Sequence, residues 1–169
     1  MNLDDVIRNY FAGEKSEAAL ILVAGIAALA VALWLWFSIR EPFARGLAST
    51  LLLVAALGLG VGGAVYFRSD AQAQQLVELK RADPTRFDAE EGPRIRQVVK
   101  SFGQYRIAYA VAVMLALVFV FLLGGALFYG LAVGLLILAA LGFTIDWYAE
   151  NRAVEYARAL EAAGALTTR

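Results

Sequence analysis

The stretch that decides the fold runs from Ile107 to Ile145, IAYAVAVMLALVFVFLLGGALFYGLAVGLLILAALGFTI, and contains no charged side chain. As one helix rising about 1.5 Å per residue, these roughly 39 residues would be about 58 Å long, almost twice the hydrocarbon thickness of a bilayer. The stretch therefore predicts two membrane spans that fold back on each other. Glycines and aromatic residues between Gly124 and Gly130 indicate the reversal, because glycine relaxes a helix and aromatic rings suit the membrane–water interface.

Two further uncharged runs precede this hairpin, and each is long enough to cross a bilayer. The sequence thus predicts an all-α integral membrane protein, a four-transmembrane-helix bundle with cytoplasmic helical extensions, built as a single membrane domain. The predicted spans are residues 18–39, 46–67, 107–124 and 128–146. The predicted polar parts are an interfacial N-terminal helix over 1–17, a helical connection over 68–106 and a helical tail over 147–169.

The polar parts carry helical patterns of their own. Apolar residues recur at helical spacing from Leu3 to Phe11, which predicts an amphipathic helix lying on the membrane surface. Asp83–Pro84 and Gly92–Pro93 predict two breaks in the central connection. Beyond the second break the apolar pattern continues into the third span, and the fourth span continues likewise past Asp146. We therefore expect long third and fourth helices that project from the membrane and pack as an amphipathic cap.

Basic residues are distributed unevenly around the predicted spans, although the formal net charge is zero. Two precede the first span, eight lie in the central connection and three follow the last span. The first connection has only Arg40 and Arg45, and the hairpin turn has none. The positive-inside rule then predicts that both termini and the central connection are cytoplasmic. We expect a multi-pass protein of the bacterial inner membrane.

The composition excludes several kinds of chemistry. The chain has no cysteine and no histidine, so it lacks the usual ligands for zinc, copper, haem and iron–sulfur clusters and the usual general base at neutral pH. Basic residues of the central connection are interleaved with acidic ones, which disfavours nucleic-acid binding and fits attraction to anionic lipid head groups. We therefore expect no cofactor, no metal ion, no nucleic-acid partner and no enzymatic activity.

Charged side chains gather at the predicted inner boundary of the spans. The candidate inner-boundary polar cluster consists of Glu17, Arg68, Arg106, Asp146, Glu150 and Arg152. Glu150 lies one helical turn beyond Asp146, so the two share a face, with Arg106 or Arg68 as the expected partner. Interfacial salt bridges that orient the bundle are one interpretation, and a recognition or ligand site is another. Catalysis by Asp146 and Glu150 is a third.

Small residues form stripes that would let helices pack closely in lipid. The candidate helix-contact residues are Ala56, Gly58, Gly60, Gly62, Gly130 and Gly134. They serve either packing within the chain or contact with a second copy or another protein. For contact outside the chain, Gly58 and Gly62 are the best candidates.

Several short stretches carry a resemblance to other proteins: residues 68–72 (RSDAQ), 82–84 (ADP) with Phe87, 100–102 (KSF), and Asp146 together with residues 149–152 (AENR). In these the chain resembles a loosely defined set of small bacterial four-span membrane proteins. The resemblance implies the same span layout and brings no established activity. In architecture alone the chain is similar to the inner-membrane immunity proteins that protect bacteria from pore-forming colicins and other membrane-targeting toxins.

Two hypotheses about function follow. The first is a non-enzymatic inner-membrane protein that binds a protein partner through its helices, most concretely an immunity protein against a membrane-targeting toxin. The alternative is a small oligomeric transporter or channel subunit with a pathway lined by Tyr66, Tyr109, Thr144 and Asp146. The expected partners are the lipid bilayer and either a toxin or further copies of the chain.

Overall fold

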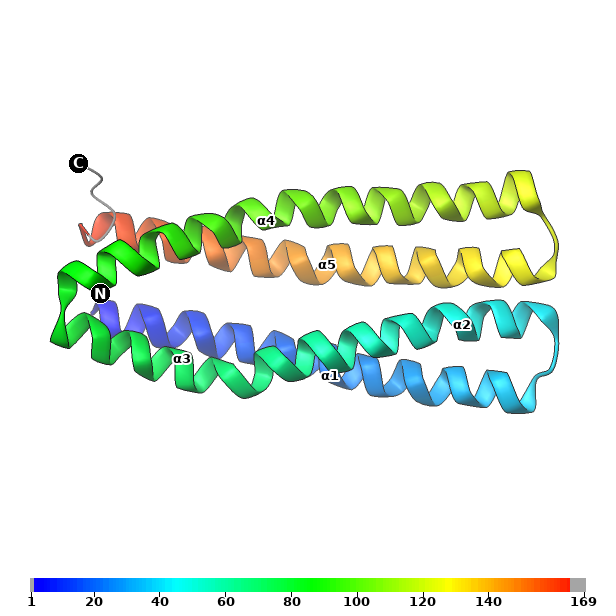
Figure 1. Cartoon of the computed structure of the whole chain (residues 1–169), viewed down its shortest axis with the longest axis horizontal. Helices are drawn as coiled ribbons and strands as arrows, with labels where there is room; N and C mark the ends of the chain where they lie inside the picture. Colours follow the sequence, from blue (N-terminus) through cyan, green and yellow to red (C-terminus); the bar gives the residue numbers. More distant parts are fainter. Residues whose placement is uncertain (1, 165–169) are drawn as a thin grey trace.

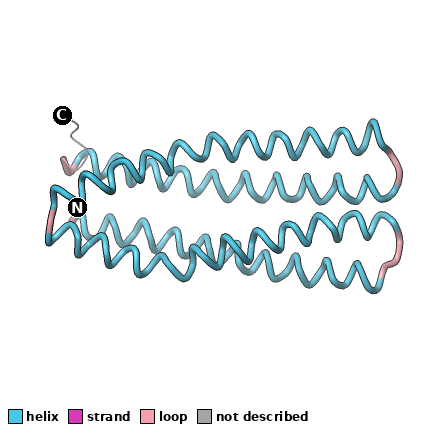
Figure 2. Tube along the Cα trace, viewed as in Figure 1, coloured by secondary structure: helices cyan, strands magenta, loops and turns pink. Residues whose placement is uncertain are grey.

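The computed structural model describes residues 2–164, and every segment of regular structure in that range is a helix. The elements are α1 (Leu3–Ser38), α2 (Pro42–Leu57), the π-helical turn η1 (Gly58–Gly62), α3 (Gly63–Ala82), α4 (Pro84–Val118), the π-helical turn η2 (Phe119–Leu123) and α5 (Ala126–Ala162). They form two long hairpins that lie side by side, α1 with the α2–η1–α3 rod and α4 with α5 (Figure 1). Short loops join them, as Figure 2 shows.

Four helices are long and apolar enough to cross a membrane: Leu3–Ser38, Pro42–Ala82, Pro84–Leu123 and Ala126–Ala162. The prediction of an all-helical protein with four such helices is therefore confirmed. Each helix exceeds the roughly 20 residues that a bilayer requires. The surplus lies at the end of the molecule where α1 begins and α5 ends (Figure 1).

Proline, aspartate and glycine residues determine where the second hairpin begins and where it turns. Pro84 is the first residue of α4, and the side chain of Asp83 caps that helix by accepting a hydrogen bond from the Arg86 N–H at 3.0 Å. Gly124 and Gly125 form the hairpin turn with φ angles of 63° and 89°, which only glycine adopts without strain. The predicted break at Asp83–Pro84 and the predicted reversal of the hairpin are both confirmed.

Two predictions about helix boundaries are wrong. The described part of residues 1–17 is no separate helix, because α1 runs without interruption from Leu3 to Ser38. Its apolar face does not lie free: Ile7, Tyr10 and Phe11 are buried against the other helices. The extensions of the other helices supply this partner surface, which the local pattern of residues 1–17 could not reveal.

The predicted break at Gly92–Pro93 is also absent, because α4 continues through Pro93. Proline has no backbone N–H, so the hydrogen bond that residue 93 would donate to the carbonyl of Ala89, four residues earlier, is missing. Pro93 and Ala89 both lie on the exposed face, where water can serve that carbonyl. The neighbouring Glu91 and Ile95 are buried, and their packing holds the helix in one piece.

The molecule has two halves with different surfaces. Residues 3–17, 68–106 and 146–162 contain most of the charged side chains, and we call this part the polar half. The remainder of the described chain, which ends in the two hairpin loops, is the apolar half. The core of the polar half buries large side chains, including Phe11, Phe87, Ile95 and Leu160. The core of the first hairpin in the apolar half buries mainly alanines.

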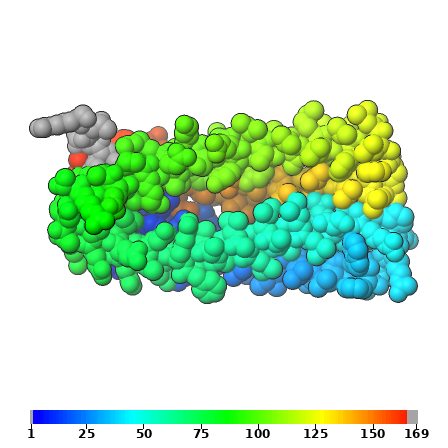
Figure 3. Space-filling view, viewed as in Figure 1, coloured from blue at the N-terminus to red at the C-terminus, as the bar shows by residue number. Residues whose placement is uncertain are grey.

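The helices of the apolar half are not packed equally. The α5 helix contacts both α4 and α2, and α2 in turn contacts α1. In the described part of the chain, no Cα atom of α4 comes within 8 Å of α1 or α2. Figure 3 shows the resulting opening between α4 and the α2–η1–α3 rod, with parts of α1 and α5 visible behind it. The two hairpins thus enclose a space near the middle of the molecule.

Candidate functional site

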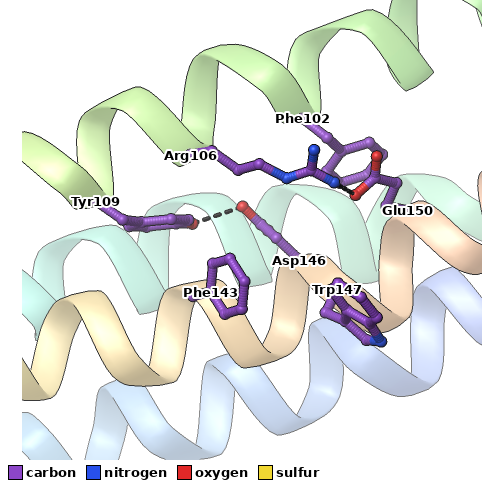
Figure 4. Close-up of a pocket in the computed structure, with 7 residues that line it drawn as sticks. All are labelled: Phe102, Arg106, Tyr109, Phe143, Asp146, Trp147 and Glu150. Atoms are coloured by element: carbon purple, nitrogen blue, oxygen red, sulfur yellow. Dashed lines mark hydrogen bonds and ion pairs between the residues drawn. The ribbon is translucent and has the colours of Figure 1, made fainter.

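Most of the predicted inner-boundary cluster forms pairs that join different helices. Glu150 of α5 accepts a hydrogen bond from Arg106 of α4 (Figure 4). Arg152 of α5 binds Glu17 of α1 through both carboxylate oxygens, and its Nη2 lies 2.7 Å from Oε2. Bidentate pairs of this kind fix orientation as well as adding energy. Together the two pairs tie α5 to α4 and to α1 at the level where the halves meet.

Arg68 pairs with neither Asp146 nor Glu150, the two acids that the sequence suggested for it. Its guanidinium lies 3.7 Å from the carboxylate of Glu14 on α1, whereas Glu150 pairs with Arg106. Beside it, Lys15 of α1 pairs with Asp70 of α3. Sequence reasoning missed Glu14, Lys15 and Asp70. They could have been found from the antiparallel arrangement of the first two spans, which sets residues before the first opposite residues after the second.

Asp146 is the one member of the six-residue cluster with no oppositely charged partner among the described residues. Its carboxylate accepts a hydrogen bond from the hydroxyl of Tyr109, with the two oxygens 2.6 Å apart. Figure 4 shows Tyr109 directed toward Asp146, while Arg106 extends toward Glu150. The charge of Asp146 is therefore held by a phenol and not neutralised by a cation.

A glycine on α5 makes the contact between Tyr109 and Asp146 possible. A Cβ at Gly142 would come within 2.5 Å of the Tyr109 ring, so any larger residue there would displace the ring. Gly142 precedes Asp146 by four residues, which places both on one face of α5. The sequence alone did not identify Gly142, because its role depends on how close α4 lies to α5.

Asp146 and Tyr109 lie between two hollow spaces of very different size. The crevice drawn in Figure 4 measures about 10 Å³, which is room for roughly one water molecule. The other space is a cavity of about 400 Å³ lined by α1, α2, η1, α4 and α5. Apart from Tyr105, Tyr109 and Asp146, all of its lining residues are apolar. Its volume lies in the range of small-molecule sites, roughly 300–1,000 Å³.

A hydrogen-bonded network around the buried carboxylate of Glu91 lies inside the polar half. Glu91 is 1% exposed and accepts hydrogen bonds from Nε and Nη2 of Arg94, both at 2.6 Å, and from the hydroxyl of Tyr156 at 2.8 Å. Burial and the charge of Glu91 raise the pKa of Tyr156, which keeps the phenol protonated as a donor. The ring of Tyr10 stacks on that of Tyr156, with centroids 4.3 Å apart. The network joins α1, α4 and α5.

Four of the six candidate helix-contact residues are used within the chain. Gly58 and Gly62 face α1, and a Cβ at Gly58 would lie 2.8 Å from the Cα of Gly25. Gly130 and Gly134 face α2, where an added Cβ would collide with the carbonyl of Phe43 or the side chain of Thr50. The pair regarded as best for contact outside the chain, Gly58 and Gly62, is thus occupied by α1.

Ala56 and Gly60 lie on the opposite face of the rod, and both are exposed. A Cβ at Gly60 would meet nothing within 4 Å. Ala64, four residues further, is exposed as well. These three residues form an outer small-residue stripe that no other part of the described chain covers.

No protein-family model matches the chain, and no curated protein or solved structure is similar to it. Within residues 2–164 there is no group of three or more aspartate and glutamate side chains placed to hold a metal ion. The function of the chain therefore has to be inferred from its own geometry. Two features stand out, the outer small-residue stripe and the 400 Å³ cavity beside Asp146.

Proposed function

We propose that this chain is a non-enzymatic inner-membrane protein that binds a second protein through contacts between helices inside the bilayer. The outer small-residue stripe of Ala56, Gly60 and Ala64 carries the proposal. Small residues four apart let the backbone of another helix approach closely, which is how helices associate in lipid. The chain uses Gly58 and Gly62 of the same rod in this way and leaves the stripe open.

The most concrete form of the proposal is immunity against a membrane-targeting toxin. A toxin helix that packs on the stripe would be kept from joining a pore. The loops at the apolar end are only the short connection after Ser38 and the turn at Gly124 and Gly125, so helix surface is the main area open to a toxin inserting from that side. In this proposal the polar half, which carries most of the lysine and arginine residues of the chain, lies in the cytoplasm.

Competition between a strain that lacks the gene and its parent tests the immunity function. The deletion strain should be killed by toxin from the parent and lose at least tenfold in number during co-culture. Equal survival of the two strains would contradict immunity.

A pair of matched variants tests the stripe in the same assay. Gly60→Leu should fail to protect the deletion strain, whereas Gly103→Leu should protect it fully. Both glycines lie in exposed helix where an added Cβ meets nothing within 4 Å, so the two substitutions are matched in their immediate surroundings. Protection by Gly60→Leu equal to that by Gly103→Leu would show that the stripe is not the contact surface.

A small transporter or channel subunit is the second candidate, and the 400 Å³ cavity favours it. Tyr109 and Asp146 of the hypothesised pathway line this cavity. Tyr66 instead lies under the ammonium of Lys15, 5.0 Å from the ring centroid, and the Thr144 hydroxyl donates to a backbone carbonyl of its own helix. Ion and solute flux across liposomes containing the purified chain tests this candidate, and a chain that supports no flux removes it.

A further inference from the structure

We propose that the 400 Å³ cavity between the two hairpins is a binding site for a lipophilic monocation, a molecule with one ammonium or phosphonium group on an apolar body. The site would use Asp146 as the counter-charge and the rings of Tyr105 and Tyr109 as aromatic contacts. This inference does not depend on the proposed protein binding, because the cavity and the outer small-residue stripe are separate surfaces.

The charge balance around the cavity calls for a cation. Glu17, Glu150 and Glu14 are each paired with an arginine, but Asp146 has only the Tyr109 hydroxyl among the described residues. A carboxylate that lines a mostly apolar cavity, near the middle of the long helix α5, is costly without a partner of opposite charge. A bound monocation would supply that partner.

The lining excludes ligands of other charge. Arg106, the one cationic side chain drawn in Figure 4, is held by Glu150 and does not line the cavity. An anionic or zwitterionic molecule would therefore find no cationic group for its negative charge. An uncharged apolar molecule would fill the space but leave Asp146 without a counter-charge.

The shape and the walls fit an apolar body with one charge. The cavity is large enough for a drug-sized molecule, and most of its surface comes from aliphatic side chains and glycines. Tyr109 contacts the carboxylate and Tyr105 lines the same cavity, and a cation over such an aromatic ring gains further attraction. The opening between α4 and the α2–η1–α3 rod gives a route from the bilayer, where a lipophilic cation concentrates.

Binding of tetraphenylphosphonium and tetraphenylborate tests the proposal, because these two ions have nearly the same size and shape and opposite charge. Binding of each to the purified full chain in detergent micelles would be measured by equilibrium dialysis. We expect saturable binding of tetraphenylphosphonium at one site per chain and no saturable binding of tetraphenylborate. Asp146→Asn should weaken phosphonium binding at least tenfold, and Asp146→Glu should restore most of it.

Two matched controls separate the cavity from general effects. Ala24 lines the cavity and Ala27, one turn away on α1, does not, although both are exposed. Ala24→Phe should fill the cavity and abolish phosphonium binding, whereas Ala27→Phe should leave it unchanged. Glu78→Gln removes an exposed acid from the polar half and should also have no effect. A thermal melt of each variant checks that it is folded.

Three results would overturn the proposal. The first is the absence of saturable phosphonium binding to the wild-type chain. The second is equal binding of the two ions that Asp146→Asn does not change, which would mean an apolar cavity filled by lipid or detergent. The third is unchanged phosphonium binding in folded Ala24→Phe. If Asp146→Asn does not fold, the Ala24 and Ala27 pair still decides the outcome.

Discussion

The two halves of this molecule bury opposite kinds of side chain. In the polar half, large residues such as Phe11, Phe87 and Ile95 are inside, and charged residues cover the surface. In the apolar half, alanines and glycines are inside, and large residues such as Phe121 and Met114 point outward. One continuous set of helices thus changes from one packing rule to the other along its length.

The solvent explains the difference. In water, burying a large apolar side chain stabilises the fold by about 1.5–3 kcal/mol. In lipid this gain vanishes, because the surroundings are as apolar as the side chain, and helices associate where small residues allow close packing. The polar half therefore joins the hairpins through a hydrophobic core, and the apolar half joins them through close backbone contacts between α2 and α5.

Truncating one phenylalanine in each half should give the greatest contrast. Phe87 is 1% exposed, and Phe87→Ala should lower the free energy of unfolding by about 3–5 kcal/mol. Phe121 is 78% exposed, and Phe121→Ala should change it by less than about 0.5 kcal/mol. Chemical unfolding in detergent micelles measures both. Similar losses for the two variants would show that the apolar half also depends on large side chains packed within the chain.

Adding one methyl group in the apolar half should sharpen the comparison. A Cβ at Gly130 would collide with the carbonyl oxygen of Phe43, so Gly130→Ala should destabilise the protein by about 1–3 kcal/mol. At Gly60 a Cβ meets nothing, and Gly60→Ala should be neutral or stabilise by up to about 1 kcal/mol through helix propensity. The same unfolding experiment applies. If Gly130→Ala were neutral, close packing of α2 on α5 would not hold the apolar half together.

The smallest expected effect concerns the ion pairs of Asp4 in the polar half. Asp4 accepts hydrogen bonds from Lys80 at 2.7 Å and from Arg81 at 2.6 Å, which lower its pKa below the usual value near 4. Since the folded pKa is the lower one, this contribution to stability is complete above about pH 4 and is lost as the pH falls through the folded pKa. The difference in Tm between wild type and Asp4→Asn should therefore be constant from about pH 8 to 5 and shrink below about pH 4.

The exposed neighbour Asp5 provides the control for this prediction. Asp5→Asn should change Tm little at any of these pH values, because its carboxylate is exposed to solvent. A Tm difference for Asp4→Asn that persisted unchanged at low pH would argue against its ion pairs as the cause.

Rules that depend on a few neighbouring residues predicted the elements well. Uncharged length identified the four apolar helices, and glycine and proline located the turns at Gly124–Gly125 and Asp83–Pro84. Antiparallel spans with charges at their ends gave Arg106 and Arg68 as alternative partners for Asp146 and Glu150, and in the structure Arg106 pairs with Glu150. In each case the controlling interaction is local or follows directly from the span layout.

Features set by contacts between distant helices could not be predicted in this way. Pro93 is tolerated because it lies on the exposed face of α4. Tyr109 reaches Asp146 because Gly142 leaves room for its ring. Which small residues remain free, Gly60 and not Gly58, depends on the side of the rod against which α1 packs.

Spin labels on single cysteines test most directly whether the halves are packed in opposite senses, and the chain has no cysteine of its own. The sites are Leu53 and Met114 in the apolar half and Arg8 and Arg96 in the polar half, all exposed. In bilayers we predict that labels at 53 and 114 collide often with oxygen and rarely with a water-soluble nickel chelate, and that labels at 8 and 96 show the reverse. Labels at 53 and 114 that are shielded from both reagents, or that meet the nickel chelate, would contradict the account.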